Sequence, residues 1–460
     1  MRRHPAGASV NRALAVWLAL RSSLWFVPAL LVTASVGLAL ALVEAQPFVH
    51  QDLAARWPRL FGAGAEGARG MLGAIATSMI TVAGVVFSVT IVALAQTSSQ
   101  YSPRVLRNFM GDRPTQIVLG AFVAVFTYCL IVLRTIRSGD EGGFVPSLAV
   151  LGGVVMAFVG VGLLIYFIHH VATAIQVSFI VARIAAETRV AIDRLFPAEA
   201  GGSAREVPAG ELDGRWDAGR SCEARRTGYV LAVDTDRLMT LAARHDLLLR
   251  VRPRIGDFVV EGDAILDAVR TAGDDGIPVD ALRLCIAIAD ERDIHQDAAH
   301  GLQQLCDIAL KALSASVHDP STASGCIDQI GALLSRAACR PEPSPWREQD
   351  GQVRLLVHGT SFGELVELAL SPLIHHAGSH EAVHQRLLGV LERLGALPLP
   401  PRRRAVVLQR LESYRSRLGA CDLPAATVEG LRQRIARVER RTKDGSEPGA
   451  AAPLTAGERE

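Results

Sequence analysis

Residues 70–96 read GMLGAIATSMITVAGVVFSVTIVALAQ and contain no charged side chain. About 20 helical residues cross a hydrocarbon core of about 30 Å, so this run predicts a transmembrane helix. Small or hydroxylated residues recur in it at steps of four, three and four, which places them on one helical face. They are Thr77, Thr81, Gly84 and Ser88. Lipid requires no such stripe, and we interpret it as facing either protein or water.

Three further uncharged apolar runs of spanning length occupy residues 24–43, 115–133 and 148–168. No such run follows residue 200, and the remaining chain is long enough for one large or two small soluble domains. The sequence therefore predicts an α-helical membrane protein with four transmembrane helices, followed by an α+β cytoplasmic region that combines a small β-hairpin or half-barrel module with helices.

Composition narrows the possible functions of the chain. Its 460 residues are 50% hydrophobic, its mean hydropathy is +0.26, and its net charge of +2 does not suggest binding to nucleic acid. The seven cysteines show no CxxC spacing, so they indicate neither a zinc site nor a disulfide framework. We expect reduced, buried thiols and no cofactor.

Arginines predict the orientation of the chain in the membrane. They cluster in the N-terminal leader, after the second apolar run and after the fourth, whereas the other two loops carry mixed charges. Because positive loops stay on the cytoplasmic side, both termini and the soluble region should be cytoplasmic, in the inner (plasma) membrane of a bacterium. The alternative for the first run is a cleaved signal peptide, with ValGluAla before Gln46 as a weak cleavage site.

The chain after the fourth apolar run keeps helical periodicity without Gly or Pro until Pro197. We expect one helix from 148 to 196, about 70 Å long, that links the membrane to the soluble region. The alternative is a break near His169 and His170, followed by an amphipathic helix at the membrane interface.

Changes in composition predict the boundaries of the parts. The predicted parts are an N-terminal cytoplasmic segment (1–23), the transmembrane domain (24–170), a helical extension (171–196), a linker (197–226), a β-rich module (227–270), a mainly helical domain (271–440) and a disordered tail (441–460). The β-rich module resembles the half-barrel hairpin of biotinyl and lipoyl carrier domains, with Gly256 and Gly262 bracketing a strand pair. A carrier role is disfavoured because the chain has no lysine except Lys311 and Lys443.

Polar residues of the soluble region give a second set of candidates: Asp297, Asp307, Asp319 and Thr322. Asp319 before Pro320 is typical of a helix start, with the aspartate as N-cap. His295, Asp297 and His300 contain metal-binding groups, but a solvated loop that caps a helix from about 298 is the favoured interpretation. If the three aspartates converge, they would support an enzyme, which is the least favoured class.

Three histidines, His376, His380 and His384, are spaced by four and form a weak candidate metal site. Gly378 and Ser379 interrupt the helix that this site would need, and we expect Ser379 to cap a helix that begins near Glu381. The arginines at 401–404 and 432–441 are expected on solvated helix faces, with contact to anionic lipid as the alternative.

Several blocks together carry a family resemblance. SMITVAGVVFSVTIVALAQTSSQYSPRVLRNF (78–109) and DRPTQIVLG (112–120) resemble the membrane signature of the DUF2254 family of predicted bacterial integral membrane proteins. GYV (228–230), GDFVVEG (256–262), QD (296–297), DIALKALS (307–314) and DPSTA (319–323) are similar to its other blocks, in the same order. Ala315 stands where the family pattern has proline, and His318 where it has asparagine. The resemblance implies the architecture and location and adds no activity, because the family is uncharacterised.

Two functional classes follow. In the first, a homo-oligomer forms a channel- or transporter-like assembly with the stripe at its pathway and a cytoplasmic mouth at Gln96, Ser99, Gln100 and Arg104. In the second, the spans anchor a sensing or binding module and nothing permeates. Close helix packing alone also explains a stripe of small residues. The expected partners are the lipid bilayer and further copies of the chain; the sequence does not identify a small ligand or ion.

Overall fold

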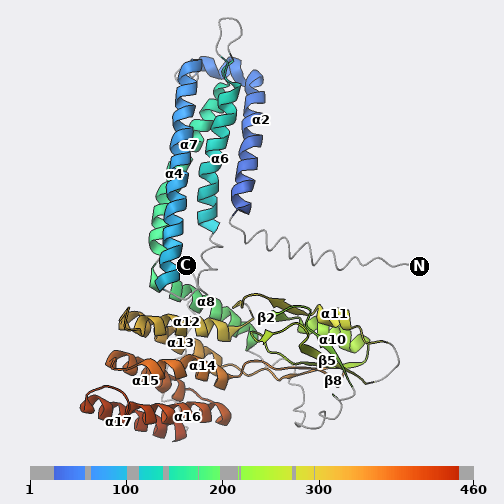
Figure 1. The fold of residues 1–460 in the computed structure, drawn as a ribbon, viewed down its shortest axis with the longest axis vertical. Helices are drawn as coiled ribbons and strands as arrows, with labels where there is room; N and C mark the ends of the chain where they lie inside the picture. Colours follow the sequence, from blue (N-terminus) through green and yellow to red (C-terminus); the bar gives the residue numbers. More distant parts are fainter. Residues whose placement is uncertain are drawn as a thin grey trace. The chain divides into compact units, whose positions relative to one another are not determined.

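The computed structural model describes residues 25–56, 64–100, 113–137, 144–174, 176–196, 216, 219–271, 276–294 and 296–444 (Figure 1). The chain divides into two compact units, Met1–Phe179 and Ile180–Glu460. The predicted N-terminal segment and all but the first residues of the predicted tail lie outside the described residues.

The first unit contains four helices that are long and apolar enough to cross a membrane. Their bounds are Phe26–Arg56 (α2), Ala65–Gln100 (α4), Arg113–Thr135 (α6) and Ser147–Ala174 (α7). Each of the four predicted apolar runs coincides with one of these helices, which confirms the four-helix prediction. The side of the membrane that each end faces stays a prediction.

Helix α6 is the most enclosed helix of this unit and packs against α2, α4 and α7 (Figure 1). It approaches α2 closely at Gly120, where a Cβ would lie 2.8 Å from the Cα of Pro28. The hydroxyl of Tyr128 donates a hydrogen bond of 2.7 Å to the carbonyl of Ala149 in α7. Close approach and interhelical hydrogen bonds hold helices together where lipid supplies no hydrophobic driving force.

The fourth apolar helix does not continue unbroken toward the second unit. Helix α7 ends at Ala174, and a separate helix, α8, spans Val177–Leu195. The N–H of Gln176 bonds the carbonyl of Thr173 at 3.1 Å, an i to i+3 turn at the end of α7. The prediction of one helix over 148–196 is therefore wrong. Helix α7 is apolar on all sides, whereas α8 buries only one face, so the two segments are suited to different surroundings.

The strands of the second unit form two small sheets that share one apolar core. Their elements are β1 (Arg220–Glu223), β2 (Gly228–Val233), α10 (Thr235–Arg244), β3 (Leu247–Val251), β4 (Phe258–Val259), β5 (Ala264–Arg270), α11 (Val279–Arg283), β6 (Ile286–Ala289), β7 (Trp346–Gln349) and β8 (Gln352–Val357). The strand orders are β1-β5-β3-β8-β7 and β4-β2-β6. Only the β3–β8 pair is parallel among these strands. Helix α10 packs on the five-stranded sheet.

The predicted β-rich module needs three corrections. Strand β1 lies inside the predicted linker, and β7 and β8 come from the region predicted to be mainly helical. Gly256 and Gly262 flank β4 alone, which pairs with β2, instead of bracketing a strand pair. Both glycines adopt positive φ, +91° and +95°, where a side chain is disfavoured.

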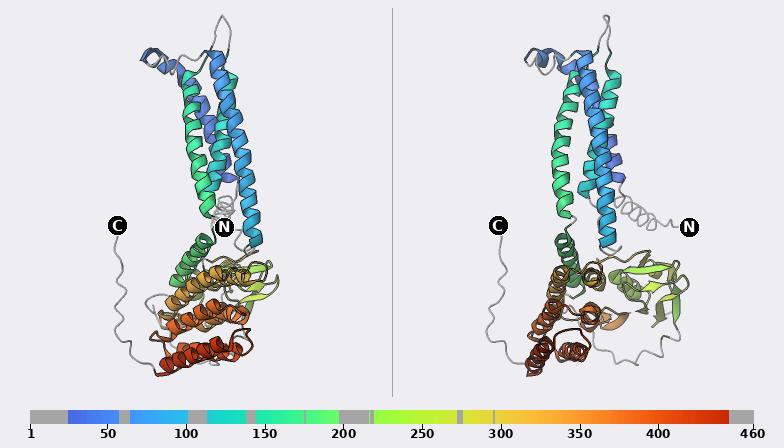
Figure 2. Two further views of the ribbon diagram at one scale, coloured as in Figure 1. Left: turned by 90° about the vertical axis from the view of Figure 1, so that its left-hand side faces the viewer. Right: turned by 60° about the vertical axis from the view of Figure 1, so that its left-hand side comes forward.

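The rest of the second unit is a stack of helix pairs (Figure 2). The helices are α12 (Ala298–Leu313), α13 (Pro320–Ala338), α14 (Phe362–His376), α15 (Glu381–Gly395), α16 (Pro401–Leu418) and α17 (Ala425–Asp444). Helices α12, α14 and α16 form one row and α13, α15 and α17 a second, each helix packing on the next in its row. This is the arrangement of an α-solenoid, in which each pair contacts its neighbours. The sequence predicted helices here but not their stacking.

Helix α8 covers the first pair of the stack. Its apolar face, which includes Ile184 and Ile192, is buried. Thr188 lies so close to Gly301 of α12 that a side chain at Gly301 has no room. Asp193 accepts from Arg336 of α13 at 2.8 Å and forms an ion pair of 3.0 Å with Arg340. Helix α8 therefore packs on the first helix pair of the stack.

Candidate functional site

The stripe of α4 faces away from the four-helix bundle. Its four residues, Thr77, Thr81, Gly84 and Ser88, are all exposed. Helix α4 enters the bundle through another face, which is formed by Leu72, Ala76, Met79, Ala83, Val86 and Ala93. At 100° per residue, the centre of the stripe lies about 160° around the helix from the centre of the packed face. The stripe therefore does not serve packing within its own bundle.

The stripe has the chemistry of a helix contact surface. The hydroxyl of Thr81 donates to the carbonyl of Thr77 at 2.8 Å, which leaves its oxygen lone pairs available as acceptors. A Cβ placed on Gly84 would meet nothing within 4 Å. Small residues on an outer face allow another transmembrane helix to approach closely.

The interior of the bundle is apolar in its described part. Its core contains large side chains such as Phe122 and Tyr128. The buried polar side chains of this unit are Ser35, Gln46, Thr115, Gln116 and Ser147. The Gln46 side chain accepts from the N–H of Leu148 at 3.0 Å, a contact between α2 and α7. These groups are spread over three helices and do not line a continuous polar path through the described bundle.

The predicted mouth residues lie at or beyond the end of α4. Helix α4 has 36 residues and is about 54 Å long, so it extends beyond a hydrocarbon core of about 30 Å. Gln96 is exposed on it, while the side chains of Ser99 and Gln100 and all of Arg104 lie outside the described residues. That the mouth forms a constriction stays a prediction.

Asp297 joins the β-rich part to the helix stack. It caps α12 by accepting the N–H of His300 at 3.0 Å, and Arg292 donates to it at 2.6 and 2.9 Å. Gly256 presses against this ion pair and leaves no room for a side chain. Burial raises the pKa of the Asp297 carboxyl above its ordinary value, although Arg292 opposes that shift. The expected cap of a helix from about 298 is confirmed, but the expected solvated loop is wrong at Asp297, which is buried.

The three aspartates do not converge on one site. Asp297 precedes α12 and Asp319 follows it, so the 16 residues of that helix separate them by about 24 Å. Asp319 accepts from the N–H groups of Ser321 and Thr322, both at 3.1 Å, and caps α13 with Pro320 in its first turn. The N-cap prediction is confirmed, and the convergence of three aspartates that would have supported an enzyme is not found.

Asp307 lines a groove of about 350 Å³ between α12 and α14, beside Cys306, Glu364 and Glu367. Glu364 forms an ion pair with Arg254, and Glu367 forms one with Arg410. Burial raises the pKa of the Cys306 thiol to about 12, which keeps it protonated and unreactive. The thiol of this groove is therefore not suited to act as a nucleophile.

The histidines do not form a metal site. His384 is fully buried, and its ring nitrogens contact the Tyr414 hydroxyl at 2.8 Å and the Gly378 carbonyl at 3.1 Å. His380 is the N-cap residue of α15, a position predicted for Ser379. Within the described ranges, no three His, Cys, Asp or Glu side chains are placed to hold a metal, and His295 lies outside those ranges. The predicted set of His376, His380 and His384 is therefore wrong, because His384 packs into the core.

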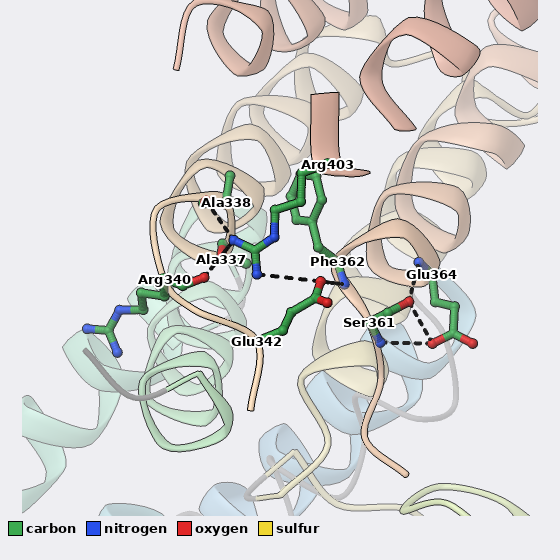
Figure 3. Close-up of polar contacts among 8 residues, drawn as sticks. All are labelled: Ala337, Ala338, Arg340, Glu342, Ser361, Phe362, Glu364 and Arg403. Atoms are coloured by element: carbon green, nitrogen blue, oxygen red, sulfur yellow. Dashed lines mark hydrogen bonds and ion pairs between the residues drawn. The ribbon is translucent and has the colours of Figure 1, made fainter. Parts of the chain in front are cut away.

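A polar cluster that the sequence analysis missed surrounds Arg403 (Figure 3). The guanidinium donates to the carbonyls of Ala337, Ala338 and Arg340 at 3.2, 2.7 and 2.6 Å and pairs with Glu342 at 3.4 Å. Glu342 in turn accepts the N–H of Phe362 at 2.9 Å. Arg403 thus connects the end of α13 with the start of α14.

The expectation that residues 401–404 lie on a solvated face is wrong for Arg403, which is buried. The sequence did contain a sign of this burial. Val407, Arg410 and Leu411 follow Arg403 at helical spacing and share its buried helix face.

Comparison with known proteins adds the family. Predicted membrane proteins of the DUF2254 family match residues 21–393. An uncharacterised protein of Mycobacterium bovis is 31% identical over 412 residues, which cover 87% of this chain and 77% of that protein. An uncharacterised protein of Mycobacterium tuberculosis matches with the same identity and coverage. No solved structure matches. With the four apolar helices and the mixed second unit in place, the chain belongs to the DUF2254 family of predicted membrane proteins, which has no established function.

Proposed function

We propose that this protein forms a homo-oligomeric, channel- or transporter-like assembly in the bacterial inner membrane. In this proposal the stripe of α4 faces a second copy of the chain, both termini are cytoplasmic, and the second unit is a cytoplasmic regulatory domain. The observation that carries the proposal is the outward direction of Thr77, Thr81, Gly84 and Ser88.

Two features support this arrangement. The described interior of one bundle is apolar, so a polar pathway would need surfaces from more than one subunit. The outer stripe supplies hydroxyl oxygens and an open glycine, the residue types that permit close contact between transmembrane helices. Closed rings of subunits would bring identical stripes around one axis.

Cross-linking tests the oligomer. Ser88→Cys is placed in a background with Cys339→Ser and Cys421→Ser, which removes the exposed and half-buried thiols and leaves five buried ones. In native membranes, a thiol cross-linker should join two chains through residue 88. Val161→Cys, on an exposed position of α7, is the matched control and should stay monomeric. Equal cross-linking at both positions, or at neither, contradicts the proposed contact.

Flux measurements then separate permeation from assembly. The wild type, Thr81→Leu and Ser88→Leu are reconstituted into liposomes, and ion flux is measured across several salts. The proposal expects flux in the wild type and a change in both variants at unchanged oligomer size. Cross-linked chains without flux would leave an oligomer that conducts nothing and would contradict the channel.

A second candidate function is a membrane-anchored binding module without permeation. The observation that favours it is the stack of helix pairs, since stacked repeats provide extended surfaces for protein partners. The groove beside Asp307 belongs to this surface. Absence of flux from cross-linked and from monomeric protein would favour this function.

A further inference from the structure

We infer that the free face of α8 binds the surface of an anionic lipid bilayer. Helix α8 buries one side on the helix stack, and the opposite side is exposed. Phe179, Ala186 and Val190 form the middle of the exposed side, since they are spaced by seven and four residues. Phe179 and Val190 are 51% and 47% exposed, which is costly for large apolar side chains in water.

Arginines stand on both sides of this apolar strip. At 100° per residue, Arg183 and Arg194 lie about 40° to 60° from Phe179 in one direction, and Arg189 lies about 80° away in the other. All three arginines are exposed. An apolar strip between cationic side chains is the pattern of a helix that lies in the headgroup region, where the arginines contact phosphate and the apolar residues enter the acyl boundary.

Both acidic residues of α8 are paired with arginines, and the arginines of this face outnumber them. Glu187 accepts from Arg183 at 3.1 Å, one turn away. By the same angles Asp193 lies about 40° from Phe179, between Phe179 and Arg189, and it is bound by Arg336 and Arg340 of α13. Among the described residues, neither Arg189 nor Arg194 forms an ion pair. The face is therefore cationic, and its charge favours phosphate headgroups.

Chain connectivity brings this face near a bilayer. Helix α7 is apolar enough to cross a membrane and ends at Ala174, and α8 begins at Val177. Two residues link them, so the three Cα–Cα steps from Ala174 to Val177 reach about 10 Å when fully extended. The first turn of α8 is thus confined to the neighbourhood of the headgroups, where even a weak attraction acts at high effective concentration. This inference does not depend on oligomerisation or permeation.

A lipid-quenching experiment with the full chain tests this inference. Val190→Cys, in the Cys339→Ser and Cys421→Ser background, is labelled with a small fluorophore and reconstituted into nanodiscs that carry a nitroxide on the headgroup. Discs of phosphatidylcholine alone are compared with discs that contain phosphatidylglycerol. We expect the anionic discs to increase quenching by about twofold, because attraction to anionic headgroups brings the labelled face into the interface. Equal quenching in both discs would overturn the inference.

Matched charge variants identify the side chains responsible. Arg183→Gln, Arg189→Gln and Arg194→Gln together should abolish the dependence on lipid charge. Arg432→Gln, Arg437→Gln and Arg440→Gln remove the same charge from exposed positions of α17 and should leave the dependence intact. If the α17 variant also loses the dependence of quenching on lipid charge, the protein responds to net charge alone. That result would also overturn the inference. Two chemically different anionic lipids at equal charge, phosphatidylglycerol and phosphatidylserine, should act alike.

Discussion

Ala315 and His318, where the family resemblance leads us to expect proline and asparagine, lie in the turn between α12 and α13. Ala315 follows Ser314 in a turn closed by the N–H of Val317 on the Ser314 carbonyl at 3.0 Å. It is therefore the second residue of a β-turn, a position that suits proline. His318 has a φ of +50°, in the left-handed region that asparagine enters more readily than histidine. Proline at 315 and asparagine at 318 would therefore suit the geometry of this turn.

His318→Asn should stabilise the second unit. A non-glycine residue held in the left-handed region costs about 1 kcal/mol or more, and asparagine recovers part of this cost. We expect a gain of about 0.5 kcal/mol from Asn, a larger gain from Gly and no gain from Ala. The stabilities of the three variants are ranked by thermal unfolding, followed through the fluorescence of Trp216 and Trp346, the tryptophans of the second unit. Equal stability of the Asn and Ala variants would contradict the role of φ.

A comparison of Gly256 and Gly262 distinguishes the cost of backbone strain from the cost of a side-chain clash. Both have φ near +90°, but Gly256 faces the Asp297–Arg292 ion pair, whereas a Cβ on Gly262 meets nothing within 4 Å. Gly262→Ala should cost about 1 kcal/mol from the backbone alone. Gly256→Ala should cost about 1–3 kcal/mol more, because the new methyl group displaces the buried pair. The difference between their unfolding midpoints is the measurement, and similar midpoints would show that Asp297 and Arg292 can move aside.

At the scale of elements, local signals were read correctly where a few neighbouring residues decide the structure. Asp319 was predicted as an N-cap, and a cap was predicted for the helix from about 298, because a cap depends only on the next three residues. The sequence analysis favoured one unbroken helix because no Gly or Pro marks the break between α7 and α8. The break falls where a helix that is apolar on all sides gives way to a helix that buries only one face. Strands β7 and β8 were missed because β8 pairs with β3, about 100 residues earlier in the chain. Pairing at such a distance leaves no periodic signal in a single sequence.

Arg403 holds three helices together, which gives a sharp test of the stack. Arg403→Ala leaves the carbonyls of Ala337, Ala338 and Arg340 without this donor and removes the cation beside Glu342. We expect a loss of about 2–4 kcal/mol in the free energy of unfolding of the second unit. Lysine at this position should restore only part of this loss, since an ammonium group lacks the planar fork.

Arg402 supplies the control for this test. It precedes Arg403 in the chain, but its side chain is exposed. Arg402→Ala should change the stability by less than about 0.5 kcal/mol. If the two alanine variants unfold at the same denaturant concentration, the contacts of Arg403 add nothing to the stability of the stack.

At the scale of the whole molecule, the sequence predicted the number and positions of the apolar helices, because about 20 consecutive apolar residues are sufficient evidence for a span. It also predicted a mixed second unit. It could not predict that Asp297, Asp307 and Asp319 stay apart or that His384 packs into the core, because both facts depend on how helices stack. The sequence could not predict the direction of the α4 stripe for the same reason. Its periodicity places the four residues on one face of the helix but does not show what that face contacts.

Acid stability is a property of the second unit as a whole. Hydrogen bonds from Arg336 lower the pKa of Asp193, and those of Thr322 lower the pKa of Asp319. Burial raises the pKa values of Asp267 and Glu364, but hydrogen bonds from arginines outweigh it and leave both below their ordinary values. Each of these groups therefore binds protons more weakly when folded than when unfolded. The stability they contribute is present above their ordinary pKa values, 3.8 for aspartate and 4.5 for glutamate, and is lost as the pH falls below them.

Asp319→Asn should flatten this acid dependence without removing the cap. Asparagine is as good an N-cap as aspartate, so the N–H groups of Ser321 and Thr322 keep an acceptor while the titrating group disappears. At pH 7 the variant should lose part of the charge-assisted stabilisation, and between about pH 4 and pH 2 it should lose less stability than the wild type. Asp422→Asn, on the exposed turn between α16 and α17, removes the same charge as a control. The test is the unfolding temperature of the second unit against pH; parallel curves for wild type and Asp319→Asn would mean that the Asp319 carboxylate is no better stabilised in the folded chain than in the unfolded one.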